Sequence, residues 1–168
     1  MEQLKILFLC HGNICRSPMA EFIMKDLVRS RGLQDYFLID SAAVTTEEIG
    51  NAIYPPAKRK LYEKGIPFDD HRARLITKKE IEDYYDMVFV MDTSNLWYLR
   101  RILGGEPGPK IRLMMECSGE RRDVQDPWYT GDFETTYRDL VRACSDLLDS
   151  LKKEMSSNKR GHFYHKPY

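Results

Sequence analysis

The sequence has no excess of charge of one sign, and this absence excludes a class of partners. Among its 168 residues, 26 lysines and arginines balance 26 aspartates and glutamates. Such a chain has no global field that would attract nucleic acid or an anionic membrane surface. It also lacks an apolar run as long as a membrane span, and its first residues, MEQ, form no signal-peptide pattern. We therefore expect neither nucleic acid nor a membrane as a partner.

Cysteine is scarce, and its spacing argues against a structural metal. The four cysteines are Cys10, Cys15, Cys117 and Cys144, and none forms a C-x-x-C pair with another. Zinc sites usually contain such pairs, so we expect no bound metal. Cysteines in a chain without a secretory signal are typical of a reducing compartment. We therefore expect a cytoplasmic protein.

The composition is that of one folded domain. Hydrophobic residues make up 42% of the chain and charged residues 31%, which is ordinary for a globular protein of this length. No internal repeat or linker divides the sequence. We expect a single domain over residues 1–155, acting as a monomer, and a flexible polar and basic tail over residues 156–168.

Strand and helix patterns alternate along the chain. Short apolar runs predict strands over residues 4–9, 36–39, 87–91 and 111–114, and helical spacing of apolar residues predicts helices over 20–28, 55–64, 96–103 and 133–151. Thr77 and Glu80 form a capping-box pattern for a short helix near Ile81, and Asp132 is the expected N-cap of the last helix. This alternation predicts an α/β fold with a parallel sheet and helices on both faces.

The stretch FLCHGNICRSP, residues 8–18, connects the first strand to the first helix. Ligands of such folds bind at the carboxyl ends of the strands, where this turn lies. Backbone N–H groups of a tight loop and the N-terminus of the following helix attract an anion. Gly12 allows the backbone to approach closely, and the guanidinium of Arg16 can hold two phosphate oxygens. The turn therefore predicts a phosphate site.

The same positive field acts on Cys10. Amides, a helix N-terminus and a guanidinium favour the thiolate, which is a good nucleophile for phosphorus. Ser17 can donate its hydroxyl to that thiolate. An isolated C-x5-R match usually reflects a buried thiol and a solvated arginine, but here the strand, Gly12, Arg16 and the Ser-Pro helix start all occur together. We therefore interpret the turn as a site that binds an anion and attacks it.

A proton donor is expected in the loop RRDVQDPWYTGD. Pro127 stiffens the backbone beside Asp126, and Trp128 and Tyr129 supply aromatic surface next to it. A phenolate leaving group has a pKa of about 10, so its departure needs an acid. Asp123 is the alternative acid, and a plain turn is the alternative interpretation of Asp-Pro.

From residue 5 to residue 151 the chain resembles the low-molecular-weight protein tyrosine phosphatases. The matching segments occur in the family's order, and they are CHGNICRSPMAE, DSAAV, HRARLIT, VFVMDTSNL and DPWY. The resemblance implies a four-stranded parallel sheet in a flavodoxin-like three-layer sandwich. It implies no cofactor and no metal, and it implies a phosphotyrosine-containing protein or an aryl phosphate as substrate, with binding of phosphate-like oxyanions.

The resemblance also implies a role for each residue of the site. Cys10 is the nucleophile, Arg16 the phosphate clamp and Asp126 the general acid and base of a two-step reaction through a cysteinyl-phosphate. The substrate-binding residues are His11, Gly12, Asn13, Ile14, Cys15, Ser17, Glu47, Trp128 and Tyr129. Ser41 and His71 support the loop, although an ordinary surface histidine remains an alternative for His71.

Glu47 departs from the family pattern. Many members place an aromatic wall residue at this position, whereas an acid there repels acidic phosphopeptides and stacks poorly on phosphotyrosine. Either the enzyme disfavours acidic substrates, or Tyr54, Trp128 or Tyr129 forms the wall. Cys15 raises a second open question, because the family pattern suggests a protective Cys10–Cys15 disulfide while a buried gap-filling residue is equally compatible.

Three other functions fit the sequence less well. Arsenate reductases share the loop type but need further redox cysteines after the third strand, where this chain reads MDTSNLWYLRR. Protein-arginine phosphatases tend to carry threonine where Ile14 stands, so Ile14 favours phosphotyrosine. A catalytically inactive phosphate-binding module would need neither Cys10 nor Asp126.

Overall fold

Four parallel strands form one sheet in the order β2-β1-β3-β4. They are β1 (Leu4–Cys10), β2 (Phe37–Ala43), β3 (Met87–Val90) and β4 (Ile111–Leu113). The computed structural model describes residues 2–157, so residues 158–168 of the predicted tail lie outside the described residues. Five helices accompany the sheet: α1 (Arg16–Ser30), α2 (Pro55–Glu63), α3 (Thr93–Leu103), α4 (Pro127–Thr130) and α5 (Phe133–Ser157). Shorter helical segments are η1 (Gln34–Tyr36), η2 (Glu80–Tyr84) and η3 (Met114–Ser118).

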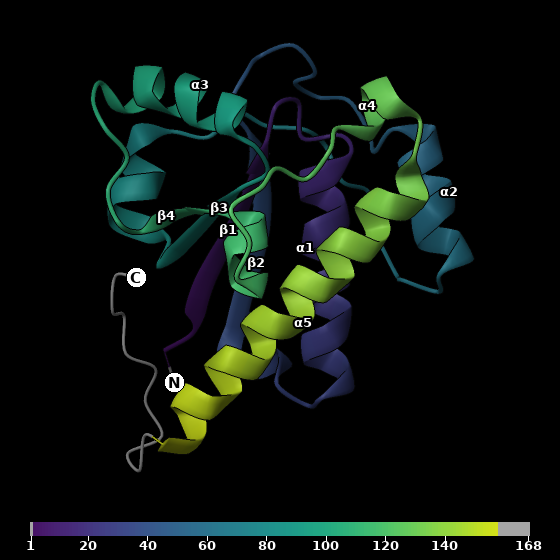
Figure 1. Ribbon diagram of the computed structural model, residues 1–168, viewed down its shortest axis with the longest axis vertical. Coiled ribbons are helices and arrows are strands. Elements are labelled where there is room, and N and C mark those ends of the chain that lie inside the picture. Colours follow the sequence, from purple (N-terminus) through teal and green to yellow (C-terminus); the bar gives the residue numbers. More distant parts are fainter. Residues whose placement is uncertain (1, 158–168) are drawn as a thin grey trace.

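The sheet is apolar on both faces, as expected for buried parallel strands. Alternate residues of β1 point to opposite sides, so Ile6 and Phe8 enter one core cluster while Leu7 and Leu9 enter another. The first cluster includes side chains of α1, α2 and α5, and the second includes side chains of α3 and η2. Figure 1 shows α1, α2 and α5 grouped to one side of the sheet and α3 on the other. The predicted α/β fold with a four-stranded parallel sheet is confirmed.

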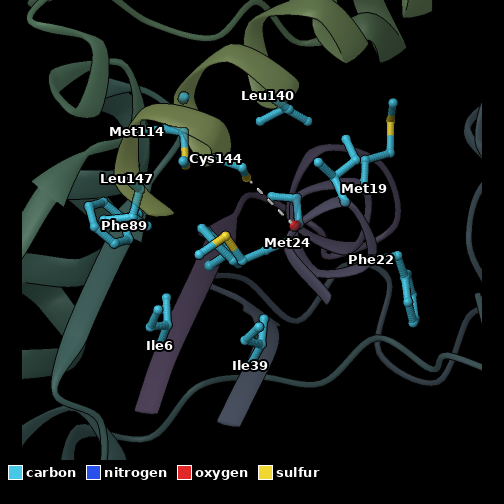
Figure 2. Packing of buried hydrophobic residues seen from close by; sticks show 14 of the residues in the cluster. Ile6, Met19, Phe22, Met24, Ile39, Phe89, Met114, Leu140, Cys144 and Leu147 are labelled. Carbon is cyan, nitrogen blue, oxygen red and sulfur yellow. Dashed lines mark hydrogen bonds between the residues drawn. The ribbon is translucent and has the colours of Figure 1, made fainter. Parts of the chain in front are cut away.

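The larger cluster joins α1 and α5 to the sheet. Leu140 and Leu147 of α5 face Met19 of α1 and Phe89 of β3 (Figure 2), and all four side chains are buried. Cys144 lies among them and is fully buried, so burial raises the pKa of its thiol. Close packing of this kind fixes the helix positions and therefore the loops at the ends of the strands.

The observed elements differ from the predicted ones at three places. β2 extends to Ala43, beyond the predicted end at residue 39, because its last residues are small or polar side chains that pair with β1 without forming an apolar run. The short helix after Thr77 contains a π-helical turn, η2, and Thr77 accepts a bond from the Glu80 N–H at 3.2 Å. α5 continues to Ser157, two residues into the segment predicted as tail.

Asp132 caps α5 as predicted, because its carboxylate accepts hydrogen bonds from the backbone N–H and the hydroxyl of Thr135, at 2.9 and 2.6 Å. Across residues 2–157, no helix combines the length and the apolar character that a membrane crossing requires.

Candidate active site

The loop over residues 10–17 joins β1 to α1 at the carboxyl edge of the sheet, and it wraps around the sulfur of Cys10. The Sγ atom lies 3.0 Å from the Ser17 hydroxyl and accepts hydrogen bonds from the backbone N–H groups of Asn13 and Ser17, at 3.3 and 3.4 Å. Both backbone N–H groups direct a partially positive hydrogen at the sulfur, and the Ser17 hydroxyl can donate a third hydrogen bond to it. The site therefore favours a sulfur that carries negative charge.

Asn13 holds this loop in a conformation that few residues adopt. Its φ is +62°, in the left-handed region that asparagine tolerates better than most residues. Its side-chain amide donates to the hydroxyls of Ser17 and Ser41 at 2.8 and 3.0 Å, while its Oδ1 accepts the backbone N–H of Arg74 at 3.2 Å. Nε2 of His71 donates to its carbonyl at 2.8 Å. Ser41 and His71 thus contact the loop from behind.

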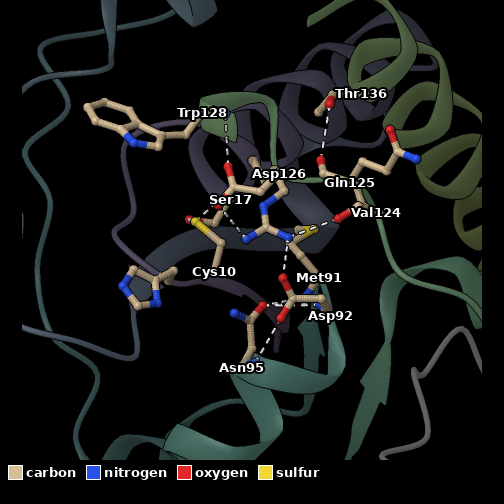
Figure 3. A network of polar contacts seen from close by, with 12 residues as sticks. Cys10, Ser17, Met91, Asp92, Asn95, Val124, Gln125, Asp126, Trp128 and Thr136 are labelled. Atoms are coloured by element: carbon tan, nitrogen blue, oxygen red, sulfur yellow. Dashed lines mark hydrogen bonds and ion pairs between the residues drawn. The ribbon is translucent and has the colours of Figure 1, made fainter. Parts of the chain in front are cut away.

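Arg16, the first residue of α1, is buried, with 2% of its surface exposed. Its Nη1 donates to the Asp92 carboxylate at 2.6 Å and to the Val124 carbonyl at 2.9 Å, and its Nη2 lies 3.3 Å from the Asp126 carboxylate (Figure 3). Burial lowers the pKa of the guanidinium, but the negative charges of Cys10, Asp92 and Asp126 outweigh burial and raise it. The side chain is therefore a fixed cation at the base of the loop.

Asp126 stands at the N-terminus of α4 and faces the same guanidinium. Its Oδ2 contacts Arg16, and its Oδ1 accepts the backbone N–H of Trp128 at 3.1 Å. Asp123, the alternative acid, instead accepts the backbone N–H of Thr93 at 3.2 Å. Only Asp126 of the two lines the pocket that contains Cys10.

The pocket above the loop has a volume of about 130 Å³. Its lining combines the loop, the segment after β2 and the start of α4, and consists of Cys10, His11, Gly12, Ile14, Cys15, Arg16, Glu47, Glu48, Asp126, Trp128 and Tyr129. Every residue of this set except Glu48 was predicted from the sequence. Of the other predicted residues, Asn13, Ser17, Ser41 and His71 lie behind the loop and connect to it by the hydrogen bonds described above.

Aromatic side chains form one wall of the pocket. Trp128 and Tyr129 are both strongly exposed, and the ring of Tyr54 packs against Trp128 with 4.6 Å between centroids. Phe133 lies on the far side of Tyr54, with 6.2 Å between centroids. The wall is therefore anchored on the N-terminal ends of α2 and α5.

Two carboxylates lie at the rim of the same pocket. Glu47 pairs with Nε2 of His11 at 2.6 Å, and the His11 ring packs edge-on against Tyr98. Glu48 packs against Gly12, where an added Cβ would approach the Glu48 Cγ to 3.0 Å, and Glu48 accepts a hydrogen bond from Asn51 at 2.6 Å. A side chain at Gly12 would therefore press against Glu48, and the rim carries two acids rather than one.

Cys15 is buried and lines the same pocket as Cys10. Burial raises the pKa of its thiol, and the negative charges of Cys10 and Asp126 raise it further. Cys15 therefore stays protonated as a free thiol. All four cysteines of the chain are free, so a Cys10–Cys15 disulfide stays a prediction.

Sequence reasoning missed Asp92, Glu48 and Glu21. Asp92 follows β3 at the same sheet edge as the loop, so the rule that ligand-binding residues follow strand ends would have found it. Glu21 is nearly buried on α1, where it accepts bonds from the Ser41 hydroxyl and the Lys25 ammonium, both at 2.6 Å. Glu21 follows no strand end, so the sequence did not indicate its role.

A thiolate-favouring C-x5-R loop at the end of the first strand, with an aspartate facing its arginine, defines the class of cysteine-dependent phosphatases. The comparison with known families is in accord. A family model described as low molecular weight phosphotyrosine protein phosphatase matches residues 5–157. The chain belongs to this family, and it is a low-molecular-weight protein tyrosine phosphatase.

Similar proteins of this family extend over nearly the same length. The low molecular weight protein-tyrosine-phosphatase YfkJ of Bacillus subtilis is 36% identical over 153 residues, covering 90% of this chain and 97% of the relative. The crystal structure of YfkJ superposes with a TM-score of 0.86 over 92% of this chain and 98% of that one. The enzyme SP-PTP of Streptococcus pyogenes has a TM-score of 0.80 at 37% identity, with 93% and 99% coverage. A Drosophila protein described as an arginine phosphatase has a TM-score of 0.79 at 33% identity, with 89% and 98% coverage.

Proposed function

We propose that this phosphatase hydrolyses phosphotyrosine through a cysteinyl-phosphate on Cys10, with Arg16 as phosphate clamp and Asp126 as general acid and base. The observation that carries the proposal is the set of hydrogen bonds from Ser17 and from two backbone N–H groups to one sulfur, in a pocket that also contains Arg16 and Asp126. A binding module would need the arginine but neither the activated sulfur nor the acid.

In the first step the Cys10 thiolate attacks phosphorus, and the bond from phosphorus to the tyrosine oxygen breaks. Asp126, protonated, donates its proton to the departing oxygen, because a phenolate with a pKa of about 10 leaves poorly. The entering phosphate takes over the Nη2 donor of Arg16 that Asp126 contacts at 3.3 Å. Asp92 keeps hold of Nη1 at 2.6 Å, so the guanidinium stays in place during this exchange.

In the second step Asp126, now ionised, accepts a proton from water, and the resulting hydroxide attacks phosphorus. The sulfur–phosphorus bond breaks, inorganic phosphate forms, and Cys10 returns to the thiolate. Ser17, at 3.0 Å from Sγ, stabilises the departing sulfur. Arg16 and the loop N–H groups stabilise the oxygens of phosphorus in both transition states, which makes them the largest electrostatic contribution.

Hydrolysis of aryl phosphates in the presence of EDTA tests this chemistry. We expect full activity of the wild type in EDTA and none of Cys10→Ser. We expect Asp126→Ala to reduce kcat by about 10²- to 10⁴-fold on phenyl phosphate, and by less on p-nitrophenyl phosphate, whose leaving group needs less protonation. Asp123→Ala is the matched control, because Asp123 lies in the same loop but outside the pocket.

Two outcomes would contradict the mechanism. Activity that EDTA abolishes would require a metal, and activity retained by Cys10→Ser would require another nucleophile. If kcat fell as far in Asp123→Ala as in Asp126→Ala, the assignment of Asp126 as the general acid would be contradicted.

The substrate class is proposed to be phosphotyrosine rather than phosphoarginine. The family as a whole acts on phosphotyrosine, while one solved neighbour is described as an arginine phosphatase. Ile14 lines the pocket and offers no hydroxyl to a substrate. Phosphotyrosine and phosphoarginine peptides offered together separate the two, and preferential release of phosphate from phosphoarginine would contradict the proposal.

The aromatic wall is proposed to consist of Trp128 and Tyr129, with Tyr54 behind Trp128, rather than of the residue at position 47. Glu47 is held 2.6 Å from Nε2 of His11 and has no ring to offer a substrate, whereas the rings of Tyr54 and Trp128 pack together. Comparing kcat/KM for acidic and basic phosphopeptides in wild type and Glu47→Trp tests this. Equal rates in all four combinations would remove Glu47 as a determinant of specificity.

We further propose that residues 1–155 form one catalytic domain that works as a monomer in the cytoplasm. One sheet underlies both core clusters, and four free cysteines suit a reducing compartment. Light scattering at assay concentration tests the monomer, and the mass of two chains would contradict it.

A further inference from the structure

A second concave surface lies on α2, outside the catalytic pocket. It is a groove of about 630 Å³, with an apolar floor and two cations beside it. Its lining residues, called the α2 groove below, are Pro55, Lys58, Arg59, Tyr62, Glu63 and Phe68. Tyr62 is 83% exposed, so its ring is free to contact an occupant of the groove.

The α2 groove begins where the aromatic wall of the catalytic pocket ends. Tyr54, the residue before α2, donates its backbone N–H to the Ile14 carbonyl of the catalytic loop at 2.9 Å. Its ring packs on Trp128, and the next residue, Pro55, already lines the groove. Figure 1 shows α2 beside α4, the short helix that carries Trp128. A peptide bound in the pocket can therefore continue onto α2.

Spacing along α2 sets how far such a peptide reaches. Pro55, Arg59 and Tyr62 recur at four- and three-residue intervals, so they share one face of the helix. Seven residues of helix rise by about 10 Å, which an extended peptide spans with about three residues. The groove thus contacts side chains several positions away from the phosphorylated residue rather than the adjacent ones.

Charge identifies the kind of segment that fits. Lys58 and Arg59 are exposed, and within residues 2–157 neither side chain has an ion-pair partner. The neighbouring Lys60, in contrast, is bound to Glu63 and Glu134, at 2.6 and 3.0 Å. Glu63, the one acid of the groove, is thereby paired, and two uncompensated cations remain. An occupant with carboxylates complements them.

We propose that the α2 groove binds a segment of the phosphoprotein substrate that carries acidic residues and one apolar side chain several residues from the phosphotyrosine. This inference rests on the proposed phosphotyrosine chemistry at Cys10. The chain's own residues 158–168, NKRGHFYHKPY, contain no acid and are repelled by the same two cations. Glu47 and Glu48 line the catalytic pocket itself, so the cations that attract acidic residues are those of the α2 groove.

The test uses two isomeric phosphotyrosine peptides of equal composition. One carries a block of acidic residues and a leucine on the N-terminal side of phosphotyrosine, and the other carries the same block on the C-terminal side. We expect the wild type to prefer one isomer about three- to tenfold in kcat/KM, through KM, with the preference weakening in high salt. Lys58→Gln/Arg59→Gln removes the preference, and Tyr62→Ser reduces it.

The matched control is Lys152→Gln/Lys153→Gln, which removes two adjacent exposed cations at the far end of α5. It leaves the preference intact. Hydrolysis of p-nitrophenyl phosphate, which is too small to reach α2, stays unchanged in all of these variants and reports on the chemistry at Cys10 alone.

Several results would contradict the proposed role of the α2 groove without contradicting the catalytic mechanism. They are equal rates for the two isomers in the wild type, a preference that survives Lys58→Gln/Arg59→Gln, and a preference that the control also loses. A wild-type dimer that Lys58→Gln/Arg59→Gln dissociates would show that the groove contacts a second copy of the chain. Failure of the proposed function differs from all of these, because p-nitrophenyl phosphate would then be hydrolysed by Cys10→Ser.

Discussion

Arg16 remains charged in a buried position because oxygen atoms of Asp92, Val124 and Asp126 surround its guanidinium. A buried cation without such partners would be strongly destabilising. Asp92 has a second role as N-cap of α3, where its Oδ1 accepts the Asn95 N–H at 2.8 Å. Asp92 is therefore a positioning residue: it ties the phosphate clamp to the end of β3 without touching the substrate.

The first prediction at this scale concerns that tie. Asp92→Asn keeps the shape of the side chain but removes the charge that holds Nη1 of Arg16, so we expect kcat/KM on p-nitrophenyl phosphate to fall by about tenfold or more. Inorganic phosphate should inhibit this variant less strongly, so its inhibition constant should rise in parallel. A purely structural defect would not produce this change. Asp123→Asn, an exposed carboxylate that caps the same stretch of α3, is the control and should leave both unchanged. Equal effects of the two substitutions would contradict the role of Asp92.

A second prediction separates the two contributions of Asn13. Asn13→Gly and Asn13→Ala both remove the amide bonds to Ser17 and Ser41, but only glycine adopts φ near +62° without strain. We expect Asn13→Ala to be less stable than Asn13→Gly by about 1 kcal/mol in urea unfolding, while kcat falls similarly in both. An alanine variant as stable as the glycine variant would show that the loop relaxes to another conformation.

The catalytic residues could be predicted because each of them belongs to a recognisable short motif. Cys10, Arg16 and Ser17 lie on one turn, and the proline after Asp126 distinguishes this aspartate from others. Asp92 and Glu48 come from other segments, and each acts through a contact that only the folded chain creates. The position of Asp92 after β3 was a usable signal, but its ion pair with Arg16 and the packing of Glu48 on Gly12 appear only in the folded chain.

At the scale of elements, the predicted strands and helices all occur, but their ends differ and the short helices η1, η3 and α4 were not predicted. The apolar pattern predicted the middle of β2 but missed its end, since Ser41 turns toward Asn13 and Glu21 and carries no hydrophobic signal. The end of β2, where Ser41 contacts the catalytic loop, is thus the part of the strand that lacks the apolar pattern. Helix starts were clearer, because Pro55 and Asp132 mark α2 and α5 directly.

A charged contact between α2 and α5 yields a prediction on pH. Hydrogen bonds from Lys60 and Lys64 lower the pKa of Glu134 from its usual 4.5 to about 2. The contact therefore stabilises the fold fully above the ordinary pKa of 4.5, and the stabilisation is lost as pH falls from there toward 2. We expect Glu134→Gln to lower Tm above about pH 5 and to match the wild type near about pH 2.

Glu63→Gln is the control, because it removes a carboxylate from the same Lys60 within α2 and leaves the link to α5 in place. A Tm difference between wild type and Glu134→Gln that stays constant across this pH range would contradict the account.

At the scale of the whole molecule, the net charge is zero but the surface around the pocket is divided. Carboxylates of Glu47 and Glu48 line the catalytic pocket, and the cations of Lys58 and Arg59 line the α2 groove. The even composition predicts no global field, and it gives no sign of this local distribution. Which charges share a rim depends on how the segments after β2 and before α2 fold, and the sequence does not show this.

The central claim is that phosphate passes through Cys10. The most direct measurement is mass spectrometry of the enzyme after rapid quenching during turnover of an aryl phosphate, in the wild type and in Asp126→Ala. With p-nitrophenyl phosphate, whose leaving group needs little protonation, the account predicts a phosphoryl group on the peptide that contains Cys10. Its occupancy is higher in Asp126→Ala, because hydrolysis of the intermediate is then slowed more than its formation. A phosphoryl group on any other residue, or steady turnover by Cys10→Ser with none on the enzyme, would contradict it.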